Sequence, residues 1–219
     1  MKYFEKLIAG GPGRRSRLHD AEGNRIDLAG LAFAPLSLAS AAARLAFDYH
    51  LPIPWLGYRA TLRLAGLLGP DKDVLEFGSG MSTKWLAERA RHVVSIERNV
   101  AWYQRVCSVL KRDKVTNVEY VLAEDTVVHP CPPLSQSFDI VLVDGLERRS
   151  CVRIAVNVVR PEGWIYLDNS DVESAARNEL VGAAKARDWH VEPFVDFVPG
   201  YLMVTQGLLV QATSVRRTC

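Results

Sequence analysis

Short apolar runs alternate with helical stretches along the last two thirds of the chain. Val, Ile and Leu dominate these runs, and each stretch between two runs has the composition of a helix or a loop. A strand covered on both faces reads as a continuous apolar run, so this order predicts an α/β fold with helices on both faces of a mostly parallel sheet. The predicted parallel strands are 73–77, 92–97, 117–122, 138–144 and 163–168.

Two further apolar runs end the chain. Residues 190–198 and 201–210 are separated by Pro199 and Gly200, a pair typical of turns. This spacing predicts a C-terminal antiparallel hairpin at the edge of the sheet. With the five parallel strands, the hairpin gives a Rossmann-like sheet of seven strands.

The N-terminal third has a different pattern. Residues 11–26 show little apolar period and are predicted to form a loop, whereas 35–47 and 58–68 are rich in helix formers. The stretch 28–43 is uncharged but shorter than the roughly 20 residues of a membrane span, which favours a buried or lid-like helix over contact with a membrane surface. We therefore expect an N-terminal helical extension over residues 1–60 and one domain over 61–219.

Composition excludes some classes of partner. Lys and Arg number 27 against 25 for Asp and Glu, and a net charge of +2 gives no field that favours DNA. The N-terminus lacks the pattern of a secretory signal, and the four cysteines are widely spaced. We expect a cytoplasmic protein without a membrane span, and leave the oligomeric state open, with a homodimer among the alternatives.

A glycine-rich turn follows the first predicted strand. Residues 78–83 read Gly-Ser-Gly-Met-Ser-Thr, so backbone without side chains meets any ligand at the carboxyl end of that strand. A dinucleotide fingerprint requires a third glycine where Thr83 stands, and a phosphate loop requires a Gly-Lys-Ser/Thr order that is absent. The turn therefore favours a nucleotide-like ligand other than NAD or ATP.

Acidic residues end the next three strands. Glu97 lies nineteen positions after Gly78, where a carboxylate can accept hydrogen bonds from ribose hydroxyls. Glu124 and Asp125 follow the third strand, where they can recognise adenine, and Asp144 ends the fourth strand. Acids at strand ends are often solvated. However, the glycine turn after the first strand and the acids after the next three strands occur in the order that one nucleotide pocket requires.

These motifs resemble those of class I S-adenosylmethionine-dependent methyltransferases. The resemblance rests on residues 74–80, 95–97, 138–145 and 160–164. It implies S-adenosylmethionine as the cofactor, with the acid before the turn and the turn itself holding the methionine end, and the acids of later strands holding ribose and adenine. The predicted cofactor-binding residues are Tyr58, Glu76, Gly78, Ser79, Gly80, Ser82, Thr83, Glu97, Arg98, Glu124, Asp125 and Asp144.

Two other segments resemble a less studied bacterial branch of these enzymes. They are residues 54–58 and 167–171, and the branch is associated with O-methylation of small molecules or glycans. The resemblance implies a small-molecule or glycan acceptor. Trp55 and Tyr58 would then flank the pocket, where an aromatic ring can cover a sulfonium, although core packing is the more common role of such residues.

The chemistry is predicted at the fourth and fifth strands. Asp144 is the candidate catalytic residue, and Asp144, Asp168 and Asn169 supply oxygen atoms suited to Mg²⁺, a candidate second cofactor. This set resembles the metal site of catechol-type enzymes, but Asp144 and Asp168 are only 24 residues apart. The alternative, which we favour, is that Asp168 and Asn169 close the strand and that Ser170 or Asp171 caps the next helix.

Three alternative functions stay open. A base-amine methyltransferase carries an Asn/Asp-Pro-Pro-Tyr type motif where this chain has residues 144–147, Asp-Gly-Leu-Glu, but an RNA or protein acceptor is compatible with the sequence. A cofactor-binding domain without catalytic activity is the second alternative. A nicotinamide dehydrogenase is the third and is disfavoured by Thr83. Arg148 and Arg149 on the adjoining loop either orient an anionic acceptor or begin a solvated helix.

Overall fold

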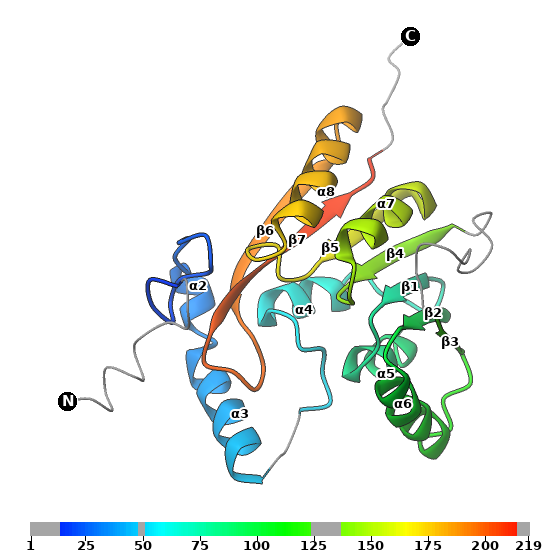
Figure 1. Cartoon of the computed structure of the whole chain (residues 1–219), viewed down its shortest axis with the longest axis horizontal. Coiled ribbons are helices and arrows are strands. Elements are labelled where there is room, and N and C mark those ends of the chain that lie inside the picture. Colours follow the sequence, from blue (N-terminus) through cyan, green and yellow to red (C-terminus); the bar gives the residue numbers. More distant parts are fainter. Residues whose placement is uncertain (1–13, 48–50, 124–136, 214–219) are drawn as a thin grey trace.

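The computed structural model describes residues 14–47, 51–123 and 137–213. Seven strands form one sheet in the order β3-β2-β1-β4-β5-β7-β6 (Figure 1). Strands β1 to β5 run parallel, and β7 runs antiparallel to both β5 and β6. The predicted fold class, including the C-terminal antiparallel hairpin, is confirmed. The strands are β1 Asp73–Phe77, β2 His92–Glu97, β3 Val118–Leu122, β4 Phe138–Val143, β5 Val159–Leu167, β6 His190–Phe197 and β7 Val204–Gln211.

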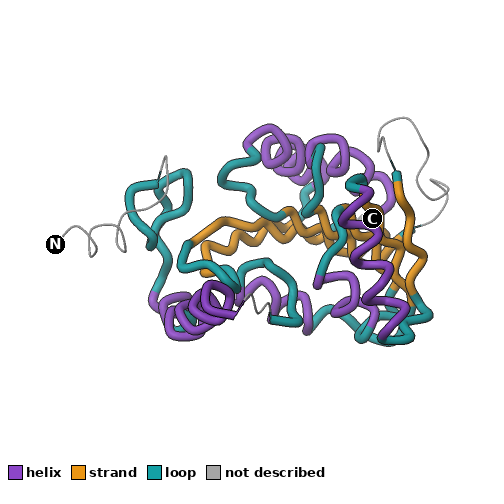
Figure 2. The backbone as a smooth tube through the Cα atoms, turned by 60° about the horizontal axis from the view of Figure 1, so that its bottom comes forward, coloured by secondary structure: helices purple, strands orange, loops and turns teal. Residues whose placement is uncertain are grey.

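Helices cover both faces of the sheet (Figure 2). Alternate residues of each strand point to opposite faces, so the buried side chains of the central strands form one core on each face of the sheet. One core joins Leu75 and Phe77 of β1 to α7 and α8, and the other joins Val74 of β1 to α4 and α5. The described helices are α2 Leu28–Leu31, α3 Ala34–Phe47, α4 Tyr58–Ala65, α5 Met81–Ala87, α6 Val100–Arg112, α7 Arg148–Val158 and α8 Ser174–Arg187.

Element boundaries differ from the predictions where tertiary contacts override local preference. The predicted capping of α8 by Ser170 or Asp171 is wrong, because α8 begins at Ser174 after Glu173. Ser170 instead donates from Oγ to the Gln206 side chain at 2.9 Å, and Asp171 accepts hydrogen bonds from the N-terminal segment. Strand β5 also begins earlier than expected, since Val159 pairs with Phe138 of β4.

The N-terminal segment is pinned to the carboxyl ends of the central strands. The Asp171 carboxylate accepts from Arg14 Nη2 at 3.0 Å and from the Ala21 backbone N–H at 2.9 Å. Both side chains of this ion pair are almost fully buried. The described part of the loop predicted over residues 11–26 is indeed a loop. Its hydrogen bonds to Asp171 attach it to the segment that follows β5.

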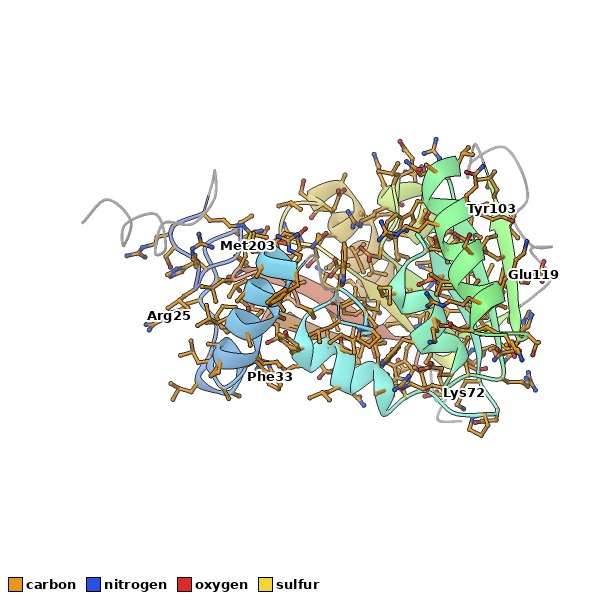
Figure 3. All side chains as sticks on the ribbon, turned by 90° about the horizontal axis from the view of Figure 1, so that it is seen from below. Arg25, Phe33, Lys72, Tyr103, Glu119 and Met203 are labelled. Atoms are coloured by element: carbon orange, nitrogen blue, oxygen red, sulfur yellow. The ribbon has the colours of Figure 1, made fainter. Side chains whose placement is uncertain are left out.

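The long helix of the N-terminal third lies at the outside of the molecule, beside α4 (Figures 1 and 3). Phe33, just before α3, stacks on Tyr58 of α4 with ring centroids 5.5 Å apart. Among the described residues, no helix combines the length and apolar character needed to cross a membrane. The division of the chain at residue 60 stays a prediction, and α4 begins two residues before it.

Candidate functional site

The turn after β1 touches the turn after β4. Gly78 has a φ of +91°, in the region that favours glycine. A Cβ atom on Gly78 would lie 2.5 Å from both the Cα and the backbone N of Gly145, which is closer than real Cβ contacts allow. These two glycines thus permit a close approach of backbone at the carboxyl ends of β1 and β4.

Glu76 lies fully buried two residues before this turn. Its Oε2 accepts hydrogen bonds from Thr83 Oγ1 at 2.7 Å and Ser95 Oγ at 2.6 Å, whereas its Oε1 is buried without a hydrogen-bond partner. Burial raises the pKa of Glu76 to about 7, against the lowering effect of hydroxyl groups that include Ser82. The site therefore contains a carboxyl group with an unused oxygen and a pKa near neutrality.

Thr83 joins the turn to this carboxyl group. Its Oγ1 accepts from the Gly80 backbone N–H at 3.0 Å while it donates to Glu76. Ser95, which sequence reasoning missed, makes the equivalent contact from β2. The parallel register pairs Glu76 with Ser95, so a serine inside an apolar strand was the available signal.

Glu97 ends β2 beside the same turn. One carboxylate oxygen accepts from the Ser79 backbone N–H at 3.0 Å and from Ser79 Oγ at 2.8 Å. The other oxygen accepts from the backbone N–H groups of Arg98 and Asn99 at 2.8 and 2.7 Å. These four bonds occupy about all the acceptor positions of a carboxylate, so a ribose hydroxyl can bind Glu97 only by replacing one of them.

Two aromatic residues outside the predicted set also hold the turn. Trp102 Nε1 donates to the Ser79 carbonyl at 2.6 Å, and the Tyr120 hydroxyl lies 2.6 Å from Ser79 Oγ. Tyr120 also stacks on Tyr103 of α6, with centroids 4.4 Å apart. No sequence motif marked these residues, because their role depends on how α6 and β3 pack beside β2.

A small crevice opens between the two touching turns. Glu97 and Arg98 form its wall on the β2 side, and Gly145 and Leu146 form its wall on the β4 side. The Leu146 side chain is exposed, whereas Phe77 and Ile96 close the floor. The crevice thus joins charged residues from the end of β2 to apolar residues from the end of β4.

A network of acids surrounds one guanidinium at the ends of β4 and β5. Arg148 Nη2 donates to Asp144 Oδ1 at 2.9 Å and to Asn169 Oδ1 at 3.1 Å, and Nη1 donates to Glu173 at 3.1 Å. The Arg148 side chain is only 14% exposed. Arg148 begins α7, as one of the two alternatives expected, but its side chain is mostly buried as a counter-ion and is not solvated.

Asp168 lies buried beside Asp144 at the edge of this network. Burial and the neighbouring Asp144 charge raise the pKa of Asp168 well above its usual range. The Tyr166 hydroxyl lies 3.4 Å from Asp168 Oδ1. Burial also raises the pKa of Asp144, and the nearby Arg148 guanidinium opposes that rise.

Comparisons with known proteins identify the architecture. The sequence matches no protein-family model and no curated protein. A methyltransferase from Pyrococcus furiosus is 16% identical, with a TM-score of 0.56 over 84% of this chain and 100% of that one. An rRNA methylase from Streptococcus thermophilus is 14% identical, with a TM-score of 0.54 over 69% and 92% of the two chains. TYW2 from M. jannaschii, in complex with AdoMet, is 17% identical, with a TM-score of 0.51 over 76% and 78%.

The chain has the class I methyltransferase fold. Similarity at these identities establishes the architecture and does not identify an acceptor. Within this methyltransferase fold, the glycine turn, Glu76 and Glu97 lie together at the carboxyl ends of β1 and β2. Glu124 and Asp125 lie outside the described residues, so the predicted adenine contacts stay a prediction.

The methyltransferase fold separates the two predicted aromatic residues. Tyr58 is buried in the N-terminal part, where its hydroxyl lies 3.1 Å from Ser40 Oγ and its ring stacks on Phe33. Its described contacts are therefore those of a core residue. Trp55 lies nearer the glycine turn, in a pocket that it shares with Gly80 and Trp102.

The predicted Mg²⁺ ligands of this methyltransferase fold come together, but around Arg148. A guanidinium that donates to Asp144 and Asn169 does not fit a divalent cation bound by the same oxygens. The described part of the chain contains no group of three His, Cys, Asp or Glu side chains placed to hold a metal. The Mg²⁺ prediction therefore has no support in the residues of this site.

Proposed function

We propose that this chain is an S-adenosylmethionine-dependent methyltransferase whose acceptor is a hydroxyl group of a small molecule or sugar. The observation that carries the proposal is the position of two carboxyl groups, Glu76 and Glu97, on either side of one glycine turn. The known structures with this fold include one in complex with AdoMet. The cofactor and the reaction are inferred from these features together.

The methionine end fits the unused oxygen of Glu76. A buried carboxylate oxygen without a partner costs free energy, and an ammonium group that donates to it removes that cost. Gly78 allows the turn after β1 to lie against Gly145, because a side chain at this position would collide with the Gly145 backbone. Glu76 would therefore hold the amino group of the cofactor in its ionised form.

The ribose fits Glu97, provided that Ser79 gives up one hydrogen bond. Ser79 Oγ has a second partner in the Tyr120 hydroxyl, so it stays hydrogen-bonded after a ribose hydroxyl replaces it on Glu97. Arg98 and Leu146 then enclose the adenine from the two walls of the crevice. When bound, the cofactor supplies a sulfonium methyl carbon that is open to in-line attack by an acceptor oxygen.

Asp144 is the proposed general base. Its side chain is 26% exposed, so an acceptor hydroxyl can reach the carboxylate while Arg148 keeps it oriented. Asp144 takes the proton that the hydroxyl loses as the oxygen forms its bond to the methyl carbon and the carbon–sulfur bond breaks. Asp168 lies beside Asp144 and affects its pKa, so it belongs to the surroundings of the proposed base. No metal ion takes part in this scheme.

A binding experiment tests the cofactor assignment. S-adenosylhomocysteine at about 100 times its dissociation constant should stabilise the folded chain by about 2.7 kcal/mol in a thermal-shift assay, and NAD should not. Glu97→Ala should weaken S-adenosylhomocysteine binding by about tenfold to a hundredfold, because hydrogen bonds to a charged group contribute about 1.5–3 kcal/mol.

Glu119→Ala is the matched control. Glu119 lies on the neighbouring strand β3 with its side chain exposed (Figure 3), so its removal should leave binding unchanged. Wild-type affinity in a folded Glu97→Ala variant would remove the ribose assignment. Binding of S-adenosylhomocysteine without transfer to any hydroxyl acceptor would favour the alternatives, an RNA or protein acceptor or a domain without catalytic activity.

A further inference from the structure

Helices α5 and α6 lie beside each other next to the glycine turn (Figure 1), and a pocket opens between them. We call it the α5–α6 pocket. Its walls come from three parts of the chain: Trp55 from the segment before α4, Gly80 and Met81 from the turn and the start of α5, and Trp102 from α6. Asp144 does not line this pocket, so the pocket is separate from the proposed general base.

The α5–α6 pocket has the size of a single ring. Its volume is about 110 Å³, and an engineered cavity of roughly 150 Å³ holds benzene. The indole rings of Trp55 and Trp102 line it together with the apolar side chains of Val106 and Val109. Aromatic rings pack against one another in stacked or edge-to-face pairs that contribute free energy beyond the burial of area. The pocket therefore favours one planar aromatic ring over a peptide segment or a long alkyl chain.

The charged residues that line the pocket are both cations, Lys84 and Arg105. Lys84 Nζ is already paired with Asp113 at 2.6 Å. Arg105 is exposed, and its guanidinium carbon lies 5.2 Å from the centre of the Trp102 ring. A ligand whose ring packs against Trp102 thus places a substituent within reach of Arg105.

Arg105 differs from the other arginines of this region. Residues 84–112 are all described and contain five arginines, of which four have a carboxylate partner and Arg105 has none. The four paired residues are Arg89, Arg91, Arg98 and Arg112. A guanidinium can bind a carboxylate through two parallel hydrogen bonds. The uncompensated charge beside an aromatic pocket therefore favours a ligand that carries a carboxylate on its ring.

Trp102 belongs both to the α5–α6 pocket and to the glycine turn. Its Nε1 donates to the Ser79 carbonyl at 2.6 Å, while its ring lines the pocket. Its backbone N–H donates to Asn99 Oδ1 at 2.9 Å, and the Asn99 backbone N–H donates to the Glu97 carboxylate at 2.7 Å. A ligand that packs against the indole ring therefore restrains a side chain that holds the turn in place.

We propose that the α5–α6 pocket binds a small aromatic carboxylate and that its occupation strengthens binding of the cofactor. The ring packs against Trp55 and Trp102, and the carboxylate pairs with Arg105. Coupling between two sites is reciprocal, so the cofactor strengthens binding of the aromatic carboxylate by the same factor. The assignment of the pocket does not depend on the proposed enzymatic function, whereas the coupling rests on it.

Calorimetric titration of the full chain with three probes, without cofactor, tests the assignment of the pocket. Benzoate should bind at one site per chain. Benzamide has the same shape without the charge and should bind at least about tenfold more weakly, because a hydrogen bond to a charged group is lost. Sulfate has the charge without the ring and should not displace benzoate at equal concentration. No binding of benzoate, equal binding of benzamide, or displacement by sulfate would each overturn the proposal.

Arg105→Met should weaken benzoate binding by about tenfold, since it removes the ion pair and keeps the length of the side chain. Lys111→Met is the matched control, because Lys111 is another exposed cation of α6 and does not line the pocket. Its affinity for benzoate should equal that of the wild type. Both residues are exposed, so neither change should impair folding. Equal affinities in the two variants would overturn the role of Arg105.

The coupling is tested by titrating S-adenosylhomocysteine with and without saturating benzoate. Affinity should rise by about fivefold or more in the wild type and in Lys111→Met. Arg105→Met should show no such rise at the same benzoate concentration. An unchanged or lowered affinity in the wild type would overturn the coupling. If benzoate binds and S-adenosylhomocysteine does not bind at all, the proposed function fails and the assignment of the pocket stands.

Discussion

The carboxyl ends of β1–β2 and of β4–β5 use acidic side chains in opposite ways. At β1–β2, Glu76 keeps one buried oxygen without a partner. At β4–β5, Asp144 and Asn169 accept hydrogen bonds from Arg148. The first site is incomplete without a cationic ligand, whereas the second is neutralised by the chain itself. The difference teaches that a cluster of acids indicates a cationic ligand or a metal only where its charge is left uncompensated.

Of the changes that test this difference between the two sites, removal of Arg148 should have the largest effect on stability. Arg148→Met leaves the Asp144 charge half-buried without a counter-ion, so we expect a loss of about 2–4 kcal/mol in the free energy of unfolding, measured by urea denaturation. Without the guanidinium, the oxygens of Asp144, Asp168 and Asn169 become available to a metal. Mg²⁺ should then raise the melting temperature of Arg148→Met and leave that of the wild type unchanged.

Arg149→Met provides the matched control for that experiment. Arg149 is 58% exposed and pairs with Glu179 on the surface, so its loss should change stability by less than about 1 kcal/mol. Equal stability of the two variants would show that Arg148 is not a buried counter-ion. Loss of wild-type activity in a strong chelator would show that the second site does take a metal.

The pKa of Glu76 should make cofactor affinity depend on pH. Only the ionised carboxylate favours an ammonium group, and a pKa of about 7 means that the ionised fraction rises about fivefold between pH 6 and pH 7. Calorimetric affinity for S-adenosylhomocysteine should therefore rise by a similar factor over this range. Glu76→Gln, which cannot ionise, should bind more weakly at pH 7 and show no such dependence.

The raised pKa of Glu76 also makes the stability of the ligand-free protein depend on pH. The folded pKa of Glu76 lies above its usual value of 4.5, so folding favours the protonated form. Its contribution to stability is full below pH 4.5 and is lost as the pH rises through 7. Glu76→Gln should remove that decline, and an unchanged pH profile of unfolding in this variant would contradict the raised pKa.

The smallest expected effect concerns Ser79. Ser79→Ala removes the hydroxyl that competes with ribose for Glu97, so affinity for S-adenosylhomocysteine should increase a few-fold, as expected for one hydrogen bond of about 1 kcal/mol. Ser108→Ala is a control with a similar change on the exposed side of α6, where Ser108 donates to the Gln104 carbonyl. Weaker binding in Ser79→Ala alone would mean that the Ser79 hydroxyl itself contacts the cofactor.

The sequence predicted the sheet well, and it predicted the positions of the glycine turn after β1 and of Glu97 at the end of β2, for physical reasons. Buried parallel strands must be continuously apolar, and a close backbone approach at Gly78 requires glycine, so both leave a local trace. Trp102 and Tyr120 left none, because helix and strand packing bring them to the turn, and Ser95 left only the weak signal of a serine inside an apolar strand. Arg148 had a weak signal, its spacing of four residues from Asp144, but only burial distinguishes a counter-ion from a solvated arginine.

Helix α3 shows where a hydrophobic pattern fails. Its sequence is almost uncharged on every side, so periodicity could not tell which face is buried, and the expectation of a buried or lid-like helix is correct only for the serine side. The burial of Ser37 and Ser40 depends on hydrogen bonds to Gly200 and Tyr201, more than 150 residues away in the chain. Contacts of this kind are not visible in a local pattern.

Isothermal titration of the folded wild type with S-adenosylhomocysteine at pH 7.5 tests the central claim most directly. We predict a saturable heat with one site per chain, which Glu97→Ala weakens and Glu119→Ala does not. The absence of any heat with this ligand and with S-adenosylmethionine, on protein shown to be folded, would contradict the assignment of the glycine turn and its two carboxyl groups to an adenosyl cofactor.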